Sequence, residues 1–227
     1  LMMNREAYEG VTDLNDFETV MYGIEPDPYY LIATSEHPLT AMRMDEIVDP
    51  SELPIKLVGV SACFRREVGA HGLSDRGIWR VHQFVKVEQI VICEPDDSWK
   101  HHEDLLQNAT DMWDSLGLHY RVVNICTGDM GTVAAKKYDL EAWLPGAGEY
   151  KEVVSCSNCT DYQANRLRIR YRTSEGNTAV HTLNSTAVAT SRALVAIMEQ
   201  CQNEDGSVTI PEVLRSYMGG KESIESL

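Results

Sequence analysis

Charged and aromatic side chains alternate in the segment from Cys63 to Glu88, CFRREVGAHGLSDRGIWRVHQFVKVE. If residues 78–93 form a strand, its two-residue period puts one set of side chains on a single face. That set is Arg80, His82, Phe84, Lys86 and Glu88. The other face, which carries Val81, Gln83, Val85 and Val87, is expected to face the core.

Arginine is the residue of this segment best suited to an anion. Arg65 and Glu67 share a face of the preceding predicted strand. A guanidinium binds a phosphate or carboxylate through two hydrogen bonds, and a strand holds it rigidly. The residues alone leave two interpretations open, a phosphate or carboxylate site and a surface of solvated ion pairs.

A second segment, HTLNSTAVATSRALVA at 181–196, predicts a strand followed by a helix. The strand is expected to end at Asn184, after which Ser185 or Thr186 would cap a helix that is apolar nearly all round. Arg192 lies within that helix, and a buried arginine needs an anionic partner. A structural carboxylate and a phosphate both meet that need.

These side chains need a framework of strands and helices to position them. Patterning predicts strands at 57–65, 78–93, 120–126, 142–144, 151–155, 167–172 and 179–183, and helices at 35–45, 95–116 and 185–202. The connection at 67–77 is glycine-rich and polar, and it contains no crossover helix. Parallel pairing would require one, so the predicted fold class is α+β, a mainly antiparallel sheet flanked by helices.

Composition narrows the functional classes. The 227 residues carry a formal charge of −15, which disfavours a uniformly basic nucleic-acid surface. No apolar run reaches the length of a membrane helix, and the start, LMMNREAYEG, is not a signal peptide, so a cytoplasmic protein without a membrane partner is expected. The acidity suggests adaptation to a high-salt cytoplasm, as in a halophilic archaeon; an ordinarily acidic protein is the alternative.

Cys156 and Cys159 have the spacing of half a zinc site. Because no second pair or histidine cluster accompanies them, reduced and mostly buried thiols are the favoured interpretation.

Several long motifs together resemble one family. FRRE with RGIWRVHQFVKVE resembles motif 2 of the class II aminoacyl-tRNA synthetases in its seryl version, and HTLNSTAVATSRALVAIME resembles the seryl version of motif 3. Segments 30–42, 122–145, 152–166 and 205–220 are also similar to this family. The combination of NST with SR resembles archaeal or eukaryotic-like seryl-tRNA synthetases.

The resemblance implies a serine–tRNA ligase that forms seryl-adenylate from L-serine and ATP with Mg²⁺, and then loads tRNA(Ser), with tRNA(Sec) as a further acceptor. Residues 1–227 would be the catalytic domain of a homodimer, without the family's N-terminal coiled-coil arm and motif 1. Two alternatives remain: a truncated paralogue that loads an amino acid onto a carrier protein, and a non-enzymatic paralogue that binds an amino acid or nucleotide.

Site residues follow from the motif positions. The resemblance makes Arg65 and Arg192 catalytic. The implied ATP site comprises Arg65, Arg66, Glu67, Val81, His82, Gln83, Phe84, Glu152, Val153, Val154, Ser155 and Arg192, with adenine stacked between Phe84 and Arg192. The implied serine site comprises Thr34, Ser35, Glu36, Arg65, Glu88, Asn184 and Thr186. Glu152 and Ser155 would hold Mg²⁺, and because they differ in strand parity, a β-bulge or the end of the strand is expected to bring both inward.

Overall fold

The computed structural model describes residues 1–68 and 77–226. Its helices are α1 (Arg5–Val11), α2 (Leu14–Phe17), α3 (Glu36–Ala41), α4 (Ser98–Ser115), α5 (Tyr162–Leu167), α6 (Thr190–Gln200) and α7 (Glu212–Arg215). Its strands are β1 (Met2–Asn4), β2 (Gly23–Ile24), β3 (Tyr29–Leu31), β4 (Ile47–Val48), β5 (Ile55–Phe64), β6 (Gln83–Cys93), β7 (Tyr120–Asn124), β8 (Lys136–Leu144), β9 (Glu149–Asn158), β10 (Arg170–Thr173), β11 (Gly176–Ala179), β12 (His181–Ala189), β13 (Val208–Thr209) and β14 (Ser223–Ile224).

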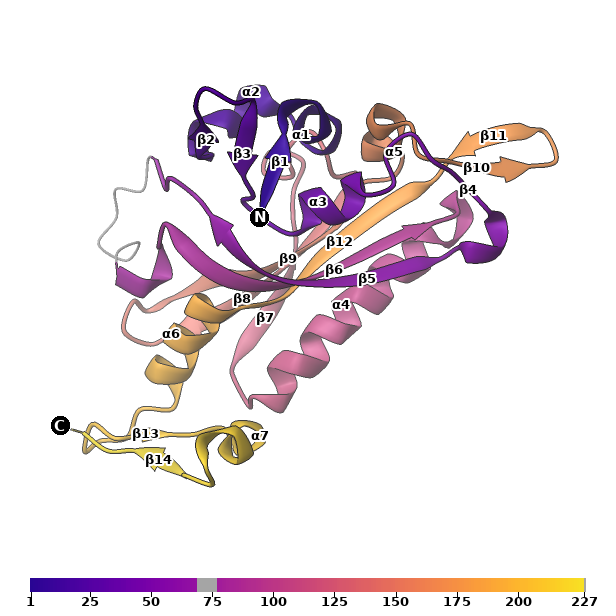
Figure 1. Ribbon diagram of the computed structural model, residues 1–227. Coiled ribbons are helices and arrows are strands. Elements are labelled where there is room, and N and C mark those ends of the chain that lie inside the picture. The colour runs from indigo at the N-terminus through magenta and orange to yellow at the C-terminus, as the bar shows by residue number, and fades with distance from the viewer. Residues whose placement is uncertain (69–76, 227) are drawn as a thin grey trace.

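A six-stranded sheet organises the molecule, in the order β5-β6-β12-β9-β8-β7 (Figure 1). Every neighbouring pair in it is antiparallel. The pairing of β5 with β6 runs from Ile55 opposite Ile92 to Phe64 opposite Gln83, so motif 2 is built on one long hairpin. The expected α+β class with a mainly antiparallel sheet is confirmed.

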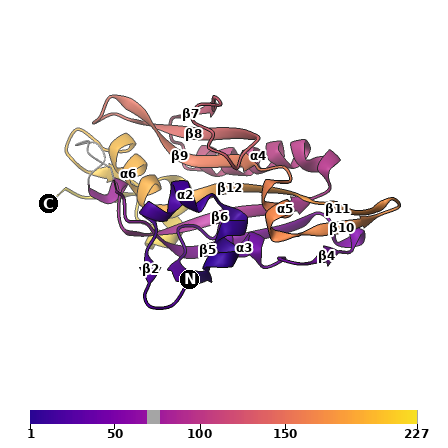
Figure 2. The ribbon, with the colours of Figure 1, turned by 90° about the horizontal axis from the view of Figure 1, so that it is seen from above.

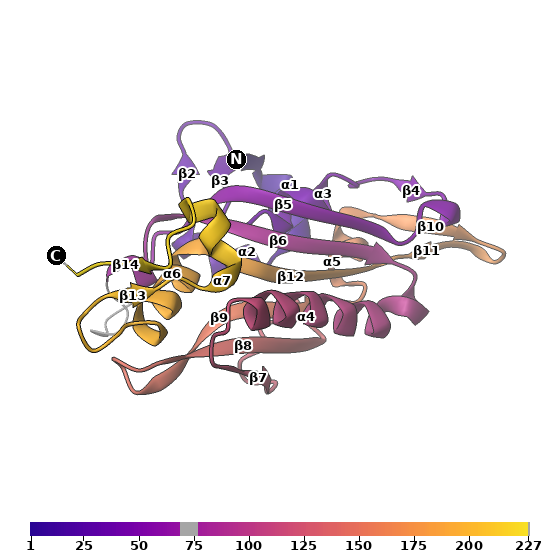
Figure 3. The ribbon, with the colours of Figure 1, turned by 90° about the horizontal axis from the view of Figure 1, so that it is seen from below.

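Helices and short strands cover the two faces of this sheet unequally. The N-terminal elements α1, α2 and α3, together with α5, lie over β5, β6 and β12 on one face (Figure 2). Helix α4 packs against β12 and β9 on the other face (Figure 3). Helix α4 also contacts the C-terminal half of β6, where Val91 and Cys93 pack with Leu105, whereas β5 lies beside α4.

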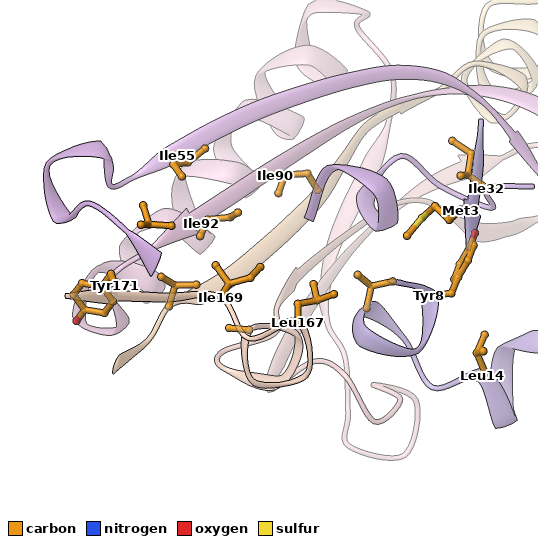
Figure 4. Close-up of a cluster of buried hydrophobic side chains, with 14 of the residues drawn as sticks. Met3, Tyr8, Leu14, Ile32, Ile55, Ile90, Ile92, Leu167, Ile169 and Tyr171 are labelled. Carbon is orange, nitrogen blue, oxygen red and sulfur yellow. The ribbon is translucent and has the colours of Figure 1, made fainter. Parts of the chain in front are cut away.

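Three apolar clusters of the described residues hold these layers together. One joins the N-terminal elements and α5 to β5 and β6, through Tyr8, Ile55, Ile90, Leu167 and Ile169 (Figure 4). The second joins α4 and α6 to β8 and β9, with Trp113 and Leu140 fully buried. The third packs α4 on β6, β9 and β12 around Leu105. Burial of apolar area is the dominant force for such packing.

The boundary between β12 and α6 corrects the sequence-based prediction. Ser185 and Thr186 do not cap a helix, because they pair with Gln89 and Glu88 inside the sheet, and the helix begins only at Thr190. The helix is also not buried all round, since Leu194 is 46% exposed. Leu167, predicted as the start of a strand, instead ends helix α5, and β10 begins at Arg170.

The valine face of β6 was also predicted wrongly. Val85 is 41% exposed, and Val58 and Val60 on the neighbouring strand are 66% and 70% exposed. The strand period separates this face from the charged one only from Gln83, where β6 begins; Val81 precedes the strand and lines the cavity described below. The period also does not say which part of a face other elements cover, and α4 covers this face of β6 only near its C-terminal end. In the described ranges no helix is long and apolar enough to cross a membrane.

Candidate active site

A cavity of about 360 Å³ opens on the sheet face that carries the N-terminal elements. Its wall combines the C-terminal end of β5, the charged face of β6, and side chains from β9, β12 and α6. The predicted site residues that line it are Thr34, Glu36, Arg65, Glu67, Val81, Phe84, Glu88, Glu152, Val153, Ser155, Asn184, Thr186 and Arg192. Residues that are far apart in the sequence therefore meet in one concave site.

One part of the cavity is cationic and aromatic. The Arg65 guanidinium carbon lies 5.3 Å from the Phe84 ring centroid, and that of Arg192 lies 5.4 Å from the centroid of Trp79. Arg192 Nη1 donates to the Glu152 main-chain oxygen at 2.8 Å and lies 3.6 Å from its carboxylate. Burial lowers the pKa of Arg192, yet an arginine keeps its charge near neutral pH. Two held guanidinium groups beside aromatic faces suit a nucleotide with its phosphates.

The expected bulge between Glu152 and Ser155 is present. Strand β8 pairs Leu140 with Val154 and the next residue, Glu141, with Glu152, so Val153 is the extra residue of β9. Glu152 and Ser155 consequently both line the cavity, although their positions differ in parity.

Asp139, opposite Ser155 on β8, adds a second carboxylate near Glu152. Burial first, and Glu152 second, raise the pKa of Asp139 to about 6. Its Oδ1 is buried without a hydrogen-bond partner among the described residues. An oxygen-only donor set with an unpartnered buried carboxylate oxygen fits a hard cation such as Mg²⁺, which binds through one or two carboxylates together with substrate phosphates.

The inner part of the cavity is small, polar and acidic. Glu88 is 1% exposed; its Oε2 lies 2.5 Å from Lys86 Nζ and accepts a hydrogen bond from the Thr186 hydroxyl at 3.3 Å. Asn184 Nδ2 donates to Cys159 Sγ at 3.5 Å. Hydroxyl, amide and carboxylate groups thus converge in a space suited to a small polar molecule.

Glu36 and His37, at the start of α3, titrate unusually. Burial, then Glu88, raises the pKa of Glu36 to about 7. Burial, then Lys86 and Arg65, lowers the pKa of His37 to about 3, so this imidazole is neutral at physiological pH. Its ring packs edge-on against Tyr8 with 5.0 Å between centroids. An ammonium group bound beside Glu36 would favour the ionised carboxylate, and the neutral His37 ring would not compete for it.

Five predicted residues lie outside the cavity wall. Arg66, His82 and Gln83 are exposed, and the His82 ring contacts the Tyr22 hydroxyl. Val154 is fully buried among residues packed on α4 and α6, because the bulge at Val153 turns it away from the cavity. Ser35 is 4% exposed and packs against Gly59. A Cβ added at Gly59 would lie 2.8 Å from the Cβ of Ser35.

Sequence reasoning missed part of the wall. The additional lining residues are Val11, Thr12, Phe17, His37, Trp79, Lys86, Met130, Val133, Ala134, Lys137, Ser157, Cys159, Ala189 and Ser191. Lys86 could have been included, since it shares the strand face of Phe84 and Glu88. The loop residues 130–134 carry no pattern that would have identified them.

Cys156 and Cys159 are both buried free thiols. The Cys156 thiol donates to the His102 main-chain oxygen at 3.7 Å, and Cys159 accepts from Asn184. Within residues 1–68 and 77–226, no group of three or more His, Cys, Asp or Glu side chains could hold a metal ion.

Comparisons with known proteins identify the family to which the chain belongs. Residues 21–201 match the family model "tRNA synthetase class II core domain (G, H, P, S and T)". A "Serine--tRNA ligase" of Methanocorpusculum labreanum is 64% identical over 224 residues, which are 97% of this chain and 53% of that protein. The chain thus spans about half the length of the curated relatives it matches.

Solved structures show the same fold. Seryl-tRNA synthetase from Pyrococcus horikoshii, complexed with ATP, superposes with a TM-score of 0.96 at 54% identity, covering 100% of this chain and 51% of that one. Cytoplasmic serine–tRNA ligase from Naegleria fowleri, in complex with AMP, gives 0.92 at 48% identity, covering 99% and 53%. With a family model that matches most of its length, this chain belongs to the class II tRNA synthetase core domain family (G, H, P, S and T).

Proposed function

We propose that this chain is the catalytic domain of a serine–tRNA ligase, which activates L-serine with ATP and transfers it to the 3′ end of tRNA(Ser). One observation carries the proposal: the cationic, aromatic part of the cavity opens directly into a small acidic part. Arg65 borders both, since it lies near Phe84 and also acts electrostatically on Glu36. Relatives named serine–tRNA ligase, and relatives crystallised with ATP or AMP, support the same assignment.

The chemistry follows from these groups. A serine carboxylate oxygen attacks the α-phosphorus of ATP, a new P–O bond forms, and pyrophosphate leaves with the electrons of the broken bond. Arg65 would hold the α-phosphate and the serine carboxylate, while Arg192 would bind the γ-phosphate. No side chain becomes covalently attached to substrate, so positioning and charge stabilisation provide the catalysis.

We assign the selection of serine to the polar side chains in the inner part of the cavity. Glu36 and Thr34 would bind the α-ammonium group, while Glu88, Asn184 and Thr186 would bind the side-chain hydroxyl. A pocket that commits buried polar groups to a hydroxyl rejects analogues that lack it, because those groups would be left unpaired.

Glu152 and Ser155 would hold Mg²⁺, with Asp139 behind them. When bound, the ion would neutralise charge on the β- and γ-phosphates. Arg192 donates a hydrogen bond to the Glu152 main-chain oxygen, which would hold the α6 side chain next to the proposed metal ligands.

Transfer RNA charging, the homodimer, the cytoplasmic location and the use of tRNA(Sec) belong to the whole protein and remain proposals. Transfer RNA charging is inferred from relatives named serine–tRNA ligase, which are about twice as long as this chain, and the other properties from the family resemblance. The acceptor separates the main proposal from a carrier-protein ligase: labelled serine should appear on tRNA(Ser) and not on protein.

Serine-dependent ATP–pyrophosphate exchange tests the activation step. Arg65→Ala should lower the exchange rate by roughly 10²–10³-fold, the usual effect of removing one transition-state donor. Arg170→Ala, which removes an exposed arginine on β10 outside the cavity, is the matched control and should retain the rate. Near-normal exchange in Arg65→Ala would contradict the assignment.

A further inference from the structure

Gln163 lies directly behind the amino-acid end of the cavity without lining it. It belongs to α5, one of the elements over the sheet, and is 1% exposed. A buried glutamine needs partners for two N–H donors and a carbonyl oxygen. Its surroundings therefore show what the residue does.

The Gln163 amide joins three elements. Its Nε2 donates to the Val11 main-chain oxygen at the end of α1 at 3.0 Å, and to Glu36 Oε1 on α3 at 2.9 Å. Its Oε1 accepts from the Thr182 hydroxyl of β12 at 2.6 Å. Both donors and the carbonyl oxygen are thus occupied in a water-poor environment.

This network permits only one orientation of the amide. A flipped amide would place its oxygen against the Val11 main-chain oxygen, which is an acceptor only, and against the Glu36 carboxylate, which is an acceptor only when ionised. It would also turn the NH₂ group toward the Thr182 hydroxyl. The Val11 oxygen and the ionised Glu36 carboxylate on one side, and the Thr182 hydroxyl on the other, therefore keep the Gln163 NH₂ group directed at Glu36.

Glu36 needs such a donor. Its carboxylate shares the cavity with Glu88, and burial combined with that second carboxylate disfavours its ionised form. The other titratable or charged groups that act on it are Tyr8 of α1, Arg65, Lys86 and Cys159. Among the described residues, the Glu36 side chain accepts one hydrogen bond, from Gln163.

We propose that Gln163 is a positioning residue of the amino-acid site, which holds the ionised Glu36 carboxylate toward the cavity so that it can bind the substrate ammonium group. This inference rests on the proposed function. Gln163 does not touch the substrate and acts through Glu36. Its hydrogen bond lowers the pKa of Glu36 and opposes the effect of burial.

The consequence has a definite sign. Removing the donor raises the pKa of Glu36 further above about 7, so a smaller fraction of the carboxylate is ionised at neutral pH. Serine binding should weaken most near neutral pH and recover partly as the pH rises. A hydrogen bond to a charged group corresponds to about a tenfold or larger change in an equilibrium constant.

The test uses protein expressed from the complete gene, with Gln163→Met and Gln163→Leu as apolar replacements of similar size. Serine-dependent ATP–pyrophosphate exchange is measured from about pH 6 to 8.5. Both variants should raise KM for serine about tenfold or more at neutral pH, leave KM for ATP within about twofold, and shift the pH profile of KM for serine upward. Asn165→Ala, at an exposed position of the same helix, should match the wild type.

The outcomes distinguish failure of this inference from failure of the proposed function. An unchanged KM for serine and an unchanged pH profile in whichever variant folds would overturn the inference. Equal losses for serine and ATP without a pH shift would also overturn it, because they would indicate a purely structural link. Absence of exchange in the wild-type protein would instead refute the proposed function.

Discussion

Glu36→Gln should stabilise the substrate-free protein at neutral and alkaline pH while removing serine activation. The side chain is half-buried in the cavity beside a second carboxylate, Glu88, and its pKa is raised from 4.5 to about 7. The replacement keeps the size and an acceptor oxygen for the Gln163 donor, but it carries no charge. Strain stored in a binding site is commonly released by such a change.

The magnitude follows from the two pKa values of Glu36. Between pH 4.5 and about 7 the folded state holds a proton that the unfolded state has lost, so stability of the wild type falls as the pH rises through this window. Each tenfold change in ionisation corresponds to about 1.4 kcal/mol. The full gain above pH 7 is therefore about 3 kcal/mol at most, and solvent in the open cavity reduces it toward about 1 kcal/mol.

Urea unfolding at about pH 8 and about pH 4.5 measures this effect. Glu36→Gln should unfold at higher urea concentration at the higher pH and at nearly the wild-type concentration at the lower one. Glu175→Gln, an exposed residue of the turn between β10 and β11, removes the same charge and should change neither. A variant that is less stable than wild type at pH 8, or equally stabilised at both values, would refute the reasoning.

Two further predictions concern stability. Lys86→Met should destabilise the protein by about 3–5 kcal/mol in urea unfolding, because it leaves Glu88 buried without its cation. The double variant Lys86→Met/Glu88→Gln should recover most of the loss. A Lys86→Met variant as stable as the wild type would contradict this pairing. If the charge of −15 reflects a high-salt cytoplasm, the melting temperature should rise steeply with KCl concentration, and full stability in dilute buffer would argue against that origin.

Much of the cationic part of the site could be read from the sequence, because its geometry is local. Arg65 and Phe84 lie at the ends of two strands that pair as one hairpin, so the two-residue period places their side chains on the same face. The family resemblance placed Glu152 and Ser155 in one site, so their different strand parity required a bulge or a strand end between them; the structure has the bulge.

Burial and long-range pairing could not be read in the same way. The valines of β5 and β6 alternate as a core face would, yet Val60 is 70% exposed. Apolar patterning identifies a face, whereas coverage depends on which element packs there, and that is decided by contacts distant in sequence. For the same reason Thr186 was expected at a helix end and lies instead in a strand paired with Glu88.

By itself the sequence determined the class of fold, the motifs and the chemical types that meet at the site, because residue type and strand period are properties of short segments. Only the tertiary structure decided which groups act together. The contact of Gln163 with Glu36 spans 127 positions and requires α5 to pack beside α3 over the sheet. The ionisation of Glu36 depends on that contact and on a second carboxylate from β6, since the free energy of a charge is determined by everything that surrounds it.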